Sequence, residues 1–457
     1  MLRLLPYLAV ALLGASSVVA QDIPTCSLTK KCPEETPCCS QYGQCGVGAY
    51  CLGGCDPRMS FSLDSCVPAP VCKDKKLKMD TTDRIANIKD YLGDSSKADF
   101  SAQGEVVEHD GSVLLTMAPR TVGTVMASTE YMWYGNVSAR MKTGIGRGVV
   151  SAFILLSDVK DEIDYEWVGV DLHTAQTNYY FQGIPDYTHS GNITGLSNTF
   201  EEWHTYEIAW TPETITWIID GKVGRTVEKK TTWNETANQW DYPQTPARVQ
   251  LSIWPGGADT NAEGTIAWAG GRIDWDSEDI KRDGYYYAAV SEVDIRCYKT
   301  DSAPGTNKGK SYIYNDARAT NDTVVDGDKP TVLKSLLGSG LDMDKDYAKE
   351  SSSGTREVIP GLSGGGPGTN GQAAGDANGG SGDGGNGDGG NGGSGTSGNG
   401  ATGTDIAPAC TVTGFTQDCS NPAGTSDDSQ NTGIKQERAL GASAFAALVA
   451  VAGMIWL

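Results

Sequence analysis

Short apolar runs separated by turn residues dominate the chain between residues 100 and 300. Runs such as RGVVSAFILLS and ITWIID carry β-branched or alternating apolar positions, and turn residues follow them, as in IDGK and WPGGAD. Such runs predict strands, and their short spacing favours antiparallel pairing. No amphipathic helix of convincing length stands among them. The pattern therefore predicts an all-β fold, an antiparallel β-sandwich of the jelly-roll type.

One of these runs is followed by three carboxylates at alternate positions. The segment EIDYEW carries Glu162, Asp164 and Glu166, with Ile163, Tyr165 and Trp167 between them or beside them. Alternate side chains of a strand share a face, so the acids face one side and the large apolar residues the other. A solvated acidic face is the simpler interpretation, but it does not explain the apolar backing. The pattern favours acids on the concave face of a sheet whose back is buried.

Two carboxylates on one face suit retaining glycoside cleavage, in which one attacks the sugar and the other protonates the leaving oxygen. A third acid between them can tune the other two by hydrogen bonding and charge repulsion. Four residues at about 3.3 Å each place the outer Cα atoms roughly 13 Å apart. Because retaining carboxyl groups sit about 5 Å apart, the two glutamates must lean together on a curved strand.

The EIDYE motif resembles the E-x-D-x-E strand of glycoside hydrolase family 16. Together with NYYFQG, SIWPGG and GTIAWAGG, the segment DEIDYEW is similar to the fungal Crh family of wall transglycosylases. The resemblance implies that Glu162 is the nucleophile, Asp164 the assisting acid and Glu166 the proton donor and general acid/base. It also implies chitin as donor and β-1,3-glucan, β-1,6-glucan or chitin oligosaccharides as acceptors. A chitin or β-glucan hydrolase on the same fold, or a non-catalytic wall-binding protein, are the alternatives.

Further residues of the same motifs are candidates for substrate contact, along with Glu166 itself. Strand alternation places Gln250 and Trp254 of RVQLSIW on one face, and Trp254 is predicted to be an exposed platform for a sugar ring. The other candidates are Thr265 in GTIAWAGG and Asn178, Tyr180 and Gln182 in NYYFQG. Each of these could equally pack or bond within the sheet.

Nine of the twelve cysteines lie between Cys26 and Cys72, in a stretch too short to build a hydrophobic core unaided. Disulfides must hold it, and the predicted disulfide cysteines are Cys26, Cys32, Cys38, Cys39, Cys45, Cys51, Cys55, Cys66, Cys72 and Cys297. Zinc binding is the competing account, but the spacings lack a paired CxxC framework. The connectivity does not follow from the counts.

This stretch, CPEETPCCSQYGQCGVGAYC, resembles the hevein-like chitin-binding module. The resemblance implies that one serine and three aromatic positions hold N-acetylglucosamine; the corresponding residues are Ser40, Tyr42, Gln44 and Tyr50. Gln44 departs from the pattern, because an amide offers no stacking face. Two functions therefore stay open for the module: chitin binding, or a structural cap.

The ends of the chain indicate secretion and anchoring. Residues 1–20 have the layout of a cleaved signal peptide. The terminal ALGASAFAALVAVAGMIWL follows small residues and a polar spacer, the order of a glycosylphosphatidylinositol (GPI) anchor signal. A C-terminal transmembrane helix is the alternative. The predicted attachment site is Asn431, with Ser426 and Gly424 as alternatives. We expect a secreted protein, anchored to the plasma membrane or cell wall.

Composition completes the layout. From Gly361 to Thr404, 21 of 44 residues are glycine, and the polar residues before them are also assigned to a disordered tether. The predicted organisation is signal 1–20, module 21–72, catalytic domain 73–300, tether 301–431 and anchor propeptide 432–457. A net charge of -21 argues against nucleic acid as a partner. The predicted chemistry requires no metal or cofactor. The predicted glycosylation sites are Asn136, Asn192, Asn234 and Asn321.

Overall fold

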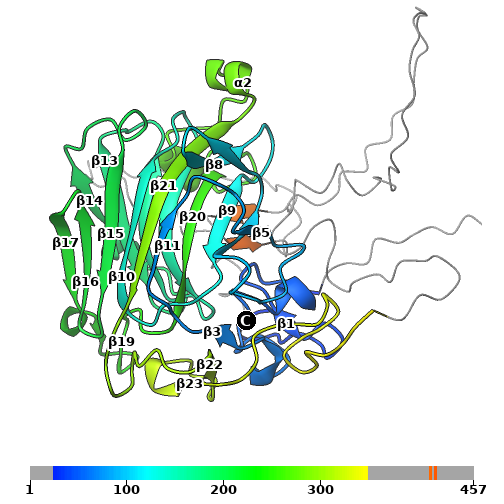
Figure 1. The fold of residues 1–457 in the computed structure, drawn as a ribbon. Helices are drawn as coiled ribbons and strands as arrows, with labels where there is room; N and C mark the ends of the chain where they lie inside the picture. The colour runs from blue at the N-terminus through cyan, green and yellow to red at the C-terminus, as the bar shows by residue number, and fades with distance from the viewer. Residues whose placement is uncertain (1–23, 348–410, 414–415, 419–457) are drawn as a thin grey trace, which may run out of the picture.

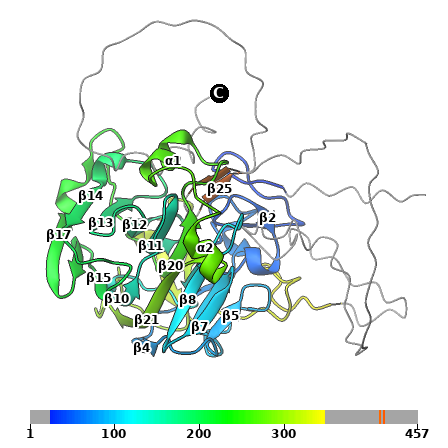
Figure 2. The ribbon, with the colours of Figure 1, turned by 90° about the horizontal axis from the view of Figure 1, so that it is seen from above.

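Two eight-stranded sheets lie face to face in the computed structural model, which describes residues 24–347, 411–413 and 416–418 (Figure 1). The first sheet runs in the order β17 (Lys222–Glu228), β16 (Thr214–Ile219), β15 (His204–Trp210), β10 (Gly135–Lys142), β21 (Tyr286–Cys297), β8 (Ser112–Met117) and β7 (Val106–His109), with β4 (Lys75–Lys78) also paired to β21. The second runs β14 (Gly191–Thr194), β13 (Thr174–Tyr180), β12 (Glu162–Val168), β11 (Val149–Ser157), β20 (Ala247–Pro255), β9 (Thr124–Ser128), β6 (Phe100–Gln103) and β5 (Ile85–Asn87). Seen from above in Figure 2, the two sheets form separate layers.

The burial of each strand follows its sequence pattern. β15 and β16 alternate between buried and partly exposed positions, so one face of each packs into the core and the other faces outward. β11 and β20 are buried at every position, as expected for the continuous apolar runs VVSAFILLS and ARVQLSIWP. Among the described strands, all pairings are antiparallel except the one between β5 and β6. The predicted all-β sandwich is confirmed.

The remaining elements are short. The helices are α1 (Glu263–Trp268) and α2 (Glu278–Asp283), and the 3-10 turns are η1 (Gly48–Tyr50), η2 (Leu63–Ser65), η3 (Tyr187–His189), η4 (Lys229–Thr231) and η5 (Asn321–Thr323). The short strands are β1 (Cys38–Cys39), β2 (Cys45–Gly46), β3 (Ala69–Pro70), β18 (Trp233–Asn234), β19 (Gln239–Trp240), β22 (Ser311–Tyr314), β23 (Val324–Gly327), β24 (Thr411–Thr413) and β25 (Thr416–Asp418). None of these helices separates the two sheets.

The cysteine-rich module, residues 24–72, is held by crosslinks rather than by regular structure. Its bridges are Cys26–Cys39, Cys32–Cys45, Cys38–Cys51 and Cys55–Cys66, and Cys72–Cys297 ties its end to β21. All ten predicted cysteines are therefore paired. The zinc alternative fails here: in the described part of the chain, the one cluster with ligand spacing is Cys26, Cys32 and Cys39, and all three are in disulfides.

Residues 301–347, assigned to the tether from their sequence, are part of the folded body, which corrects that prediction. β22 pairs with β23 and also with β3 at the end of the module. Further on, Leu333 is 1% exposed and packs in one cluster with Tyr50 and Leu52 of the module. This strap, residues 328–347, is the yellow segment beside the module in Figure 1. Its few apolar residues are too widely spaced to predict an element, but they bury against a surface that the module supplies.

The predicted signal peptide, the glycine-rich part of the tether, Cys410, Cys419, the attachment residues Gly424, Ser426 and Asn431, and the anchor propeptide lie outside the described residues. Within the described ranges no helix is long and apolar enough to cross a membrane.

Candidate active site on strand β12

Strand β12 carries the three acids on one face, as the alternation predicts. Glu162 and Glu166 are partly exposed, and Asp164 between them is only 2% exposed. On the other face the aromatic rings of Tyr165 and Trp167 stack and are buried in the core between the sheets. The apolar backing thus anchors the strand, and the three carboxyl groups are held on the side that faces away from the first sheet.

Burial makes all three carboxyl groups harder to ionise, and neighbouring carboxyl charges add to this effect at Glu162 and Glu166. Burial raises the pKa of Glu162, and the charge of Asp164 raises it further. Burial raises the pKa of Glu166 well above its usual value, and both Asp164 and Glu162 add to that rise. Burial also raises the pKa of Asp164, but Arg225 and the backbone of Asn178 oppose the rise. Glu166 is the one acid whose pKa is raised by the charges of both of the others, which favours its protonated form.

Arg225 is a functional candidate that the sequence did not reveal. It lies on β17 of the other sheet, where its guanidinium sits 4.7 Å from the centre of the Trp217 ring. Its Nη1 donates to the backbone and side-chain oxygens of Thr177, and its Nη2 donates to the His189 carbonyl. Trp217 in turn donates from Nε1 to the backbone oxygen of Asp164, at 2.9 Å. The arginine thus provides positive charge near Asp164 from behind the strand, and nothing in the local sequence links the two positions.

Strand β13 places two predicted residues beside the acids. Tyr180 pairs with Glu162 and Asn178 with Asp164 in the register. Asn178 Nδ2 donates to the Tyr180 hydroxyl at 2.6 Å. Burial raises the pKa of Tyr180, and the three acids raise it further, so the hydroxyl keeps its proton and remains a donor. Gln176, which no sequence motif indicated, lies opposite Glu166 and accepts from Trp268 Nε1 at 2.8 Å.

On the other side of β12, each acid is aligned with a residue of β11 and, beyond it, with a residue of β20. Asp164 pairs with Ile154, which pairs with Gln250. Gln250 is therefore on the same face as the acids, two strands away or about 10 Å. It is buried, and within the described part of the chain its Oε1 has no hydrogen-bond partner. This placement agrees with the predicted alternation of RVQLSIW.

Trp254 is on the expected face but is not an exposed platform, which corrects the prediction. Its side chain is 2% exposed and stacks on Trp268 at a centroid distance of 6.0 Å. Its indole N–H lies near Glu166, where it lowers the pKa of that group without making a hydrogen bond of normal geometry. Thr265, also predicted to meet sugar, is fully buried within α1. The short helix α1 lies beside the ends of β11, β12 and β20 (Figure 2), where its Trp268 packs in one cluster with Trp254. No local pattern in the sequence predicts this cover.

Gln182 has a structural role in place of the predicted substrate contact. Its Oε1 accepts from Arg58 of the module at 2.9 Å, and its Nε2 donates to the backbone oxygens of Arg318 and Ala319. The amide is thus engaged on both sides. Its backbone N–H donates to Asp161, a buried carboxylate on the far face from the acids.

A family model for glycosyl hydrolases family 16 matches residues 94–270, which include β12. Crh-like protein 3 of Botryotinia fuckeliana is 61% identical over 329 residues, or 72% of this chain and 73% of that protein. Congo red hypersensitive protein 2 of Saccharomyces cerevisiae is 48% identical over 336 residues, or 72% of each chain. The chain belongs to the Crh-like proteins of glycosyl hydrolases family 16. A solved structure of a Crh5 transglycosylase covers 59% of this chain and 99% of its own, with 29% identity and a TM-score of 0.47. Because it belongs to this family, the Crh-like chain is a glycoside hydrolase or transglycosylase.

The sugar-holding positions of the hevein-like module are not available in this Crh-like chain. Ser40, Tyr42, Gln44 and Tyr50 are 3%, 8%, 4% and 1% exposed. The Tyr42 hydroxyl donates to Gln103 of β6 at 3.1 Å, and Tyr50 packs in the cluster that includes Leu333 of the strap. A buried ring cannot stack on a sugar, so the structure favours the structural-cap function over chitin binding.

The predicted glycosylation sites differ in access. Asn192 on β14 is exposed. The others are partly buried, and their amides donate to protein groups: Asn136 to Glu207, Asn234 to Asp241 and Asn321 to the Tyr134 hydroxyl. Asn192 is therefore the most accessible of the four asparagines.

Proposed function

We propose that this Crh-like chain is a retaining transglycosylase that cleaves chitin and transfers the released chain to β-glucan or chitin acceptors. Its product in the fungal wall is a crosslink between chitin and glucan. The observation that carries the proposal is the arrangement on β12: two partly exposed glutamates flank a buried aspartate on one face, and burial together with the charges of Asp164 and Glu162 raises the pKa of Glu166.

In the first step the Glu162 carboxylate attacks the anomeric carbon of the donor. The bond from that carbon to the leaving oxygen breaks, and Glu166 gives its proton to that oxygen. Burial and the charges of Asp164 and Glu162 keep Glu166 protonated for this purpose. Arg225 favours ionised Asp164, which supplies part of that charge.

In the second step the roles of the carboxyl groups reverse. Glu166, now ionised, takes the proton of an acceptor hydroxyl as that oxygen attacks the anomeric carbon and releases Glu162. A sugar hydroxyl gives transfer and water gives hydrolysis. The membership in the Crh-like proteins supports transfer, and anchoring beside newly made chitin would hold the enzyme close to acceptor ends at high effective concentration.

The donor sugar is bound by polar groups that share a face with the acids. Asn178 and Tyr180 lie beside Asp164 and Glu162, and Gln250 lies on the other side of β11. Neutral hydroxyl and amide groups suit an uncharged polysaccharide, since they need no ion pairing. Secretion and a GPI anchor complete the proposal; they rest on the terminal segments of the sequence.

The test is a transfer assay with a chitin oligosaccharide donor and a fluorescent laminarin-type acceptor, with products analysed by mass spectrometry. The wild-type enzyme should give hybrid products, and Glu162→Gln should abolish both transfer and hydrolysis because the attacking carboxylate is lost. Glu292→Gln, which removes a carboxyl from the surface of β21, serves as the matched control and should stay active.

Two results would contradict the proposal. Shortened donor without hybrid product would make the enzyme a hydrolase. Activity retained in Glu162→Gln would show that another group is the nucleophile.

A further inference from the structure

The module is bonded directly to the edge of the catalytic site. The backbone N–H of Gly54 lies 2.8 Å from Asp158 Oδ1 and 3.1 Å from the Tyr131 hydroxyl. Arg58 donates to the carbonyl of Val159 at 2.8 Å. Residues 158–161 form the turn that leads into β12, so the module reaches within a few residues of Glu162.

Gln41 extends this contact to the face that carries the acids. It is a module residue, 8% exposed, and its Oε1 accepts from Arg248 Nη2 at 3.2 Å and from Gln250 Nε2 at 3.4 Å. Arg248 and Gln250 are alternate residues of β20 and thus share a face. Gly54 leaves room for the amide, because a Cβ at that position would lie 2.7 Å from Gln41 Oε1.

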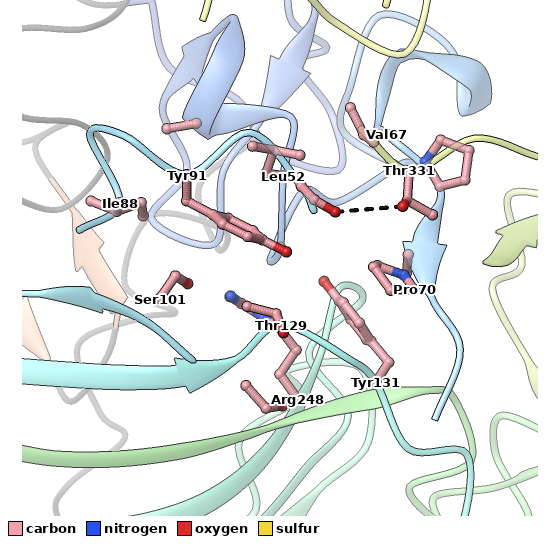
Figure 3. A pocket seen from close by; sticks show the side chains of 16 residues that line it. Leu52, Val67, Pro70, Ile88, Tyr91, Ser101, Thr129, Tyr131, Arg248 and Thr331 are labelled. Atoms are coloured by element: carbon pink, nitrogen blue, oxygen red, sulfur yellow. Dashed lines mark hydrogen bonds between the residues drawn. The ribbon is translucent and has the colours of Figure 1, made fainter. Parts of the chain in front are cut away.

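Arg248 determines how both amides are oriented. A guanidinium has only donors, so the Gln41 atom that faces it must be the oxygen. The same oxygen faces Gln250, so the Gln250 atom that points to the module must be the nitrogen. Figure 3 shows Arg248 between Tyr91 and Tyr131 at the junction of the module with the sheets. The charge of Arg248 also acts on the buried Asp158, and its Nη2 donates to the amide oxygen of Gln41.

This orientation of the amide determines what Gln250 Oε1 can bond to. With Nε2 directed to the module, this oxygen is the atom of the amide left for other partners. It is buried and has no hydrogen-bond partner among the described residues. An unpaired buried acceptor destabilises the protein, and a donor from bound substrate would remove that cost. Gln250 is aligned with Asp164 across β11, through Ile154. An N-acetylated sugar can supply such a donor from its acetamide N–H.

We propose that Gln41 is a positioning residue of the active site: it holds the Gln250 amide so that Oε1 accepts from the acetamide N–H of a chitin-type donor. The module is then a working part of the enzyme rather than a separate binding domain. This inference rests on the proposed function, because it assumes a chitin-type donor.

The test is steady-state kinetics of full-length protein with chitin oligosaccharide as varied donor. Gln41→Leu should raise KM roughly tenfold, as expected when one hydrogen bond of about 1.4 kcal/mol is lost, while kcat stays within about twofold and the pH profile keeps its shape. Gln41→Glu should restore KM, since a carboxylate also accepts from Arg248 and Gln250. Thr36→Val is the matched module control; it removes a buried hydroxyl that has no partner.

A double-mutant cycle separates positioning from general damage. In a Gln250→Ala background, Gln41→Leu should have no further effect on KM. The inference is overturned if Gln41→Leu leaves KM unchanged, if its effect persists in that background, or if Gln41→Glu is no better than Leu. These failures differ from failure of the proposed function, in which the wild-type enzyme itself makes no hybrid product from chitin.

Discussion

Replacing Asp164 by asparagine tests whether charge repulsion sets the protonation of the catalytic pair. The side chain keeps its size, and the position is buried, so the main change is the loss of one negative charge beside Glu166. Removing that charge lowers the pKa of Glu166. The proton donor then ionises at a lower pH, and the alkaline limb of the pH profile should move toward acid. The pKa of Glu162 also falls, so the acid limb should move the same way.

The magnitude follows from strand geometry. Side chains two residues apart on one face are separated by about 7 Å. At an effective dielectric constant of about 20, two unit charges at that distance interact by about 2.4 kcal/mol. Glu166 is partly exposed, and solvent screening reduces this interaction to about 1.4 kcal/mol, so the alkaline limb of the profile should move by about one pH unit. The two limbs belong to the coupled pair, so the shift is measured on the whole profile.

The assay is kcat/KM for transfer measured from pH 4 to 9 in wild type, Asp164→Asn and Asp276→Asn. Asp276 is an exposed carboxylate in the loop before α2, so its variant has the same change in net charge and should keep the wild-type profile. An alkaline limb that stays in place, or moves to higher pH, in Asp164→Asn would refute the view that Asp164 acts on Glu166 through its charge.

Two further predictions concern stability. A carboxyl group whose pKa is raised in the folded state stabilises the fold below its unfolded pKa and loses that contribution as the pH rises. Glu166→Gln should therefore raise the free energy of unfolding near pH 8 by about 1 to 2 kcal/mol. It should have little effect near pH 4. Leu333→Ala should lower the free energy of unfolding by about 2 to 4 kcal/mol through loss of buried contacts. Val332 is the exposed neighbour, and Val332→Ala should change the free energy of unfolding by less than about 0.5 kcal/mol. Urea denaturation at the stated pH values measures both.

Opposite outcomes would count against the corresponding structural claims. A Glu166→Gln protein that gains as much stability at pH 4 as at pH 8 would mean that ionisation of Glu166 is not the cause. Equal and small effects of Leu333→Ala and Val332→Ala would mean that the strap does not pack on the module.

The site was predictable where it depends on a single strand. The period of two put Glu162, Asp164 and Glu166 on one face, and the same rule put Gln250 on the face they share. It could not predict what covers that face. Trp254 matched the alternation, yet α1 and Trp268 bury it.

The cysteine-rich module was also predictable only in part. Its cysteine content implied a crosslinked unit, and its motif implied a sugar-binding surface. The burial of Tyr42 and Tyr50 depends on residues distant in the sequence, Gln103 and Leu333. A motif defines which side chains are present, but whether they can bind a sugar depends on which surface packs against them.

By itself, the sequence determined the all-β class, the disulfide-rich module, the three acids on one face and the apolar residues behind them, because each of these follows from local periodicity or composition. The tertiary structure alone decided that Arg225 acts on Asp164, that residues 301–347 join the folded body and that Gln41 reaches Gln250. These pairings join residues 61 apart in the first case and 209 apart in the last. Contacts over such separations arise when whole surfaces pack together, and no local pattern in the chain encodes them.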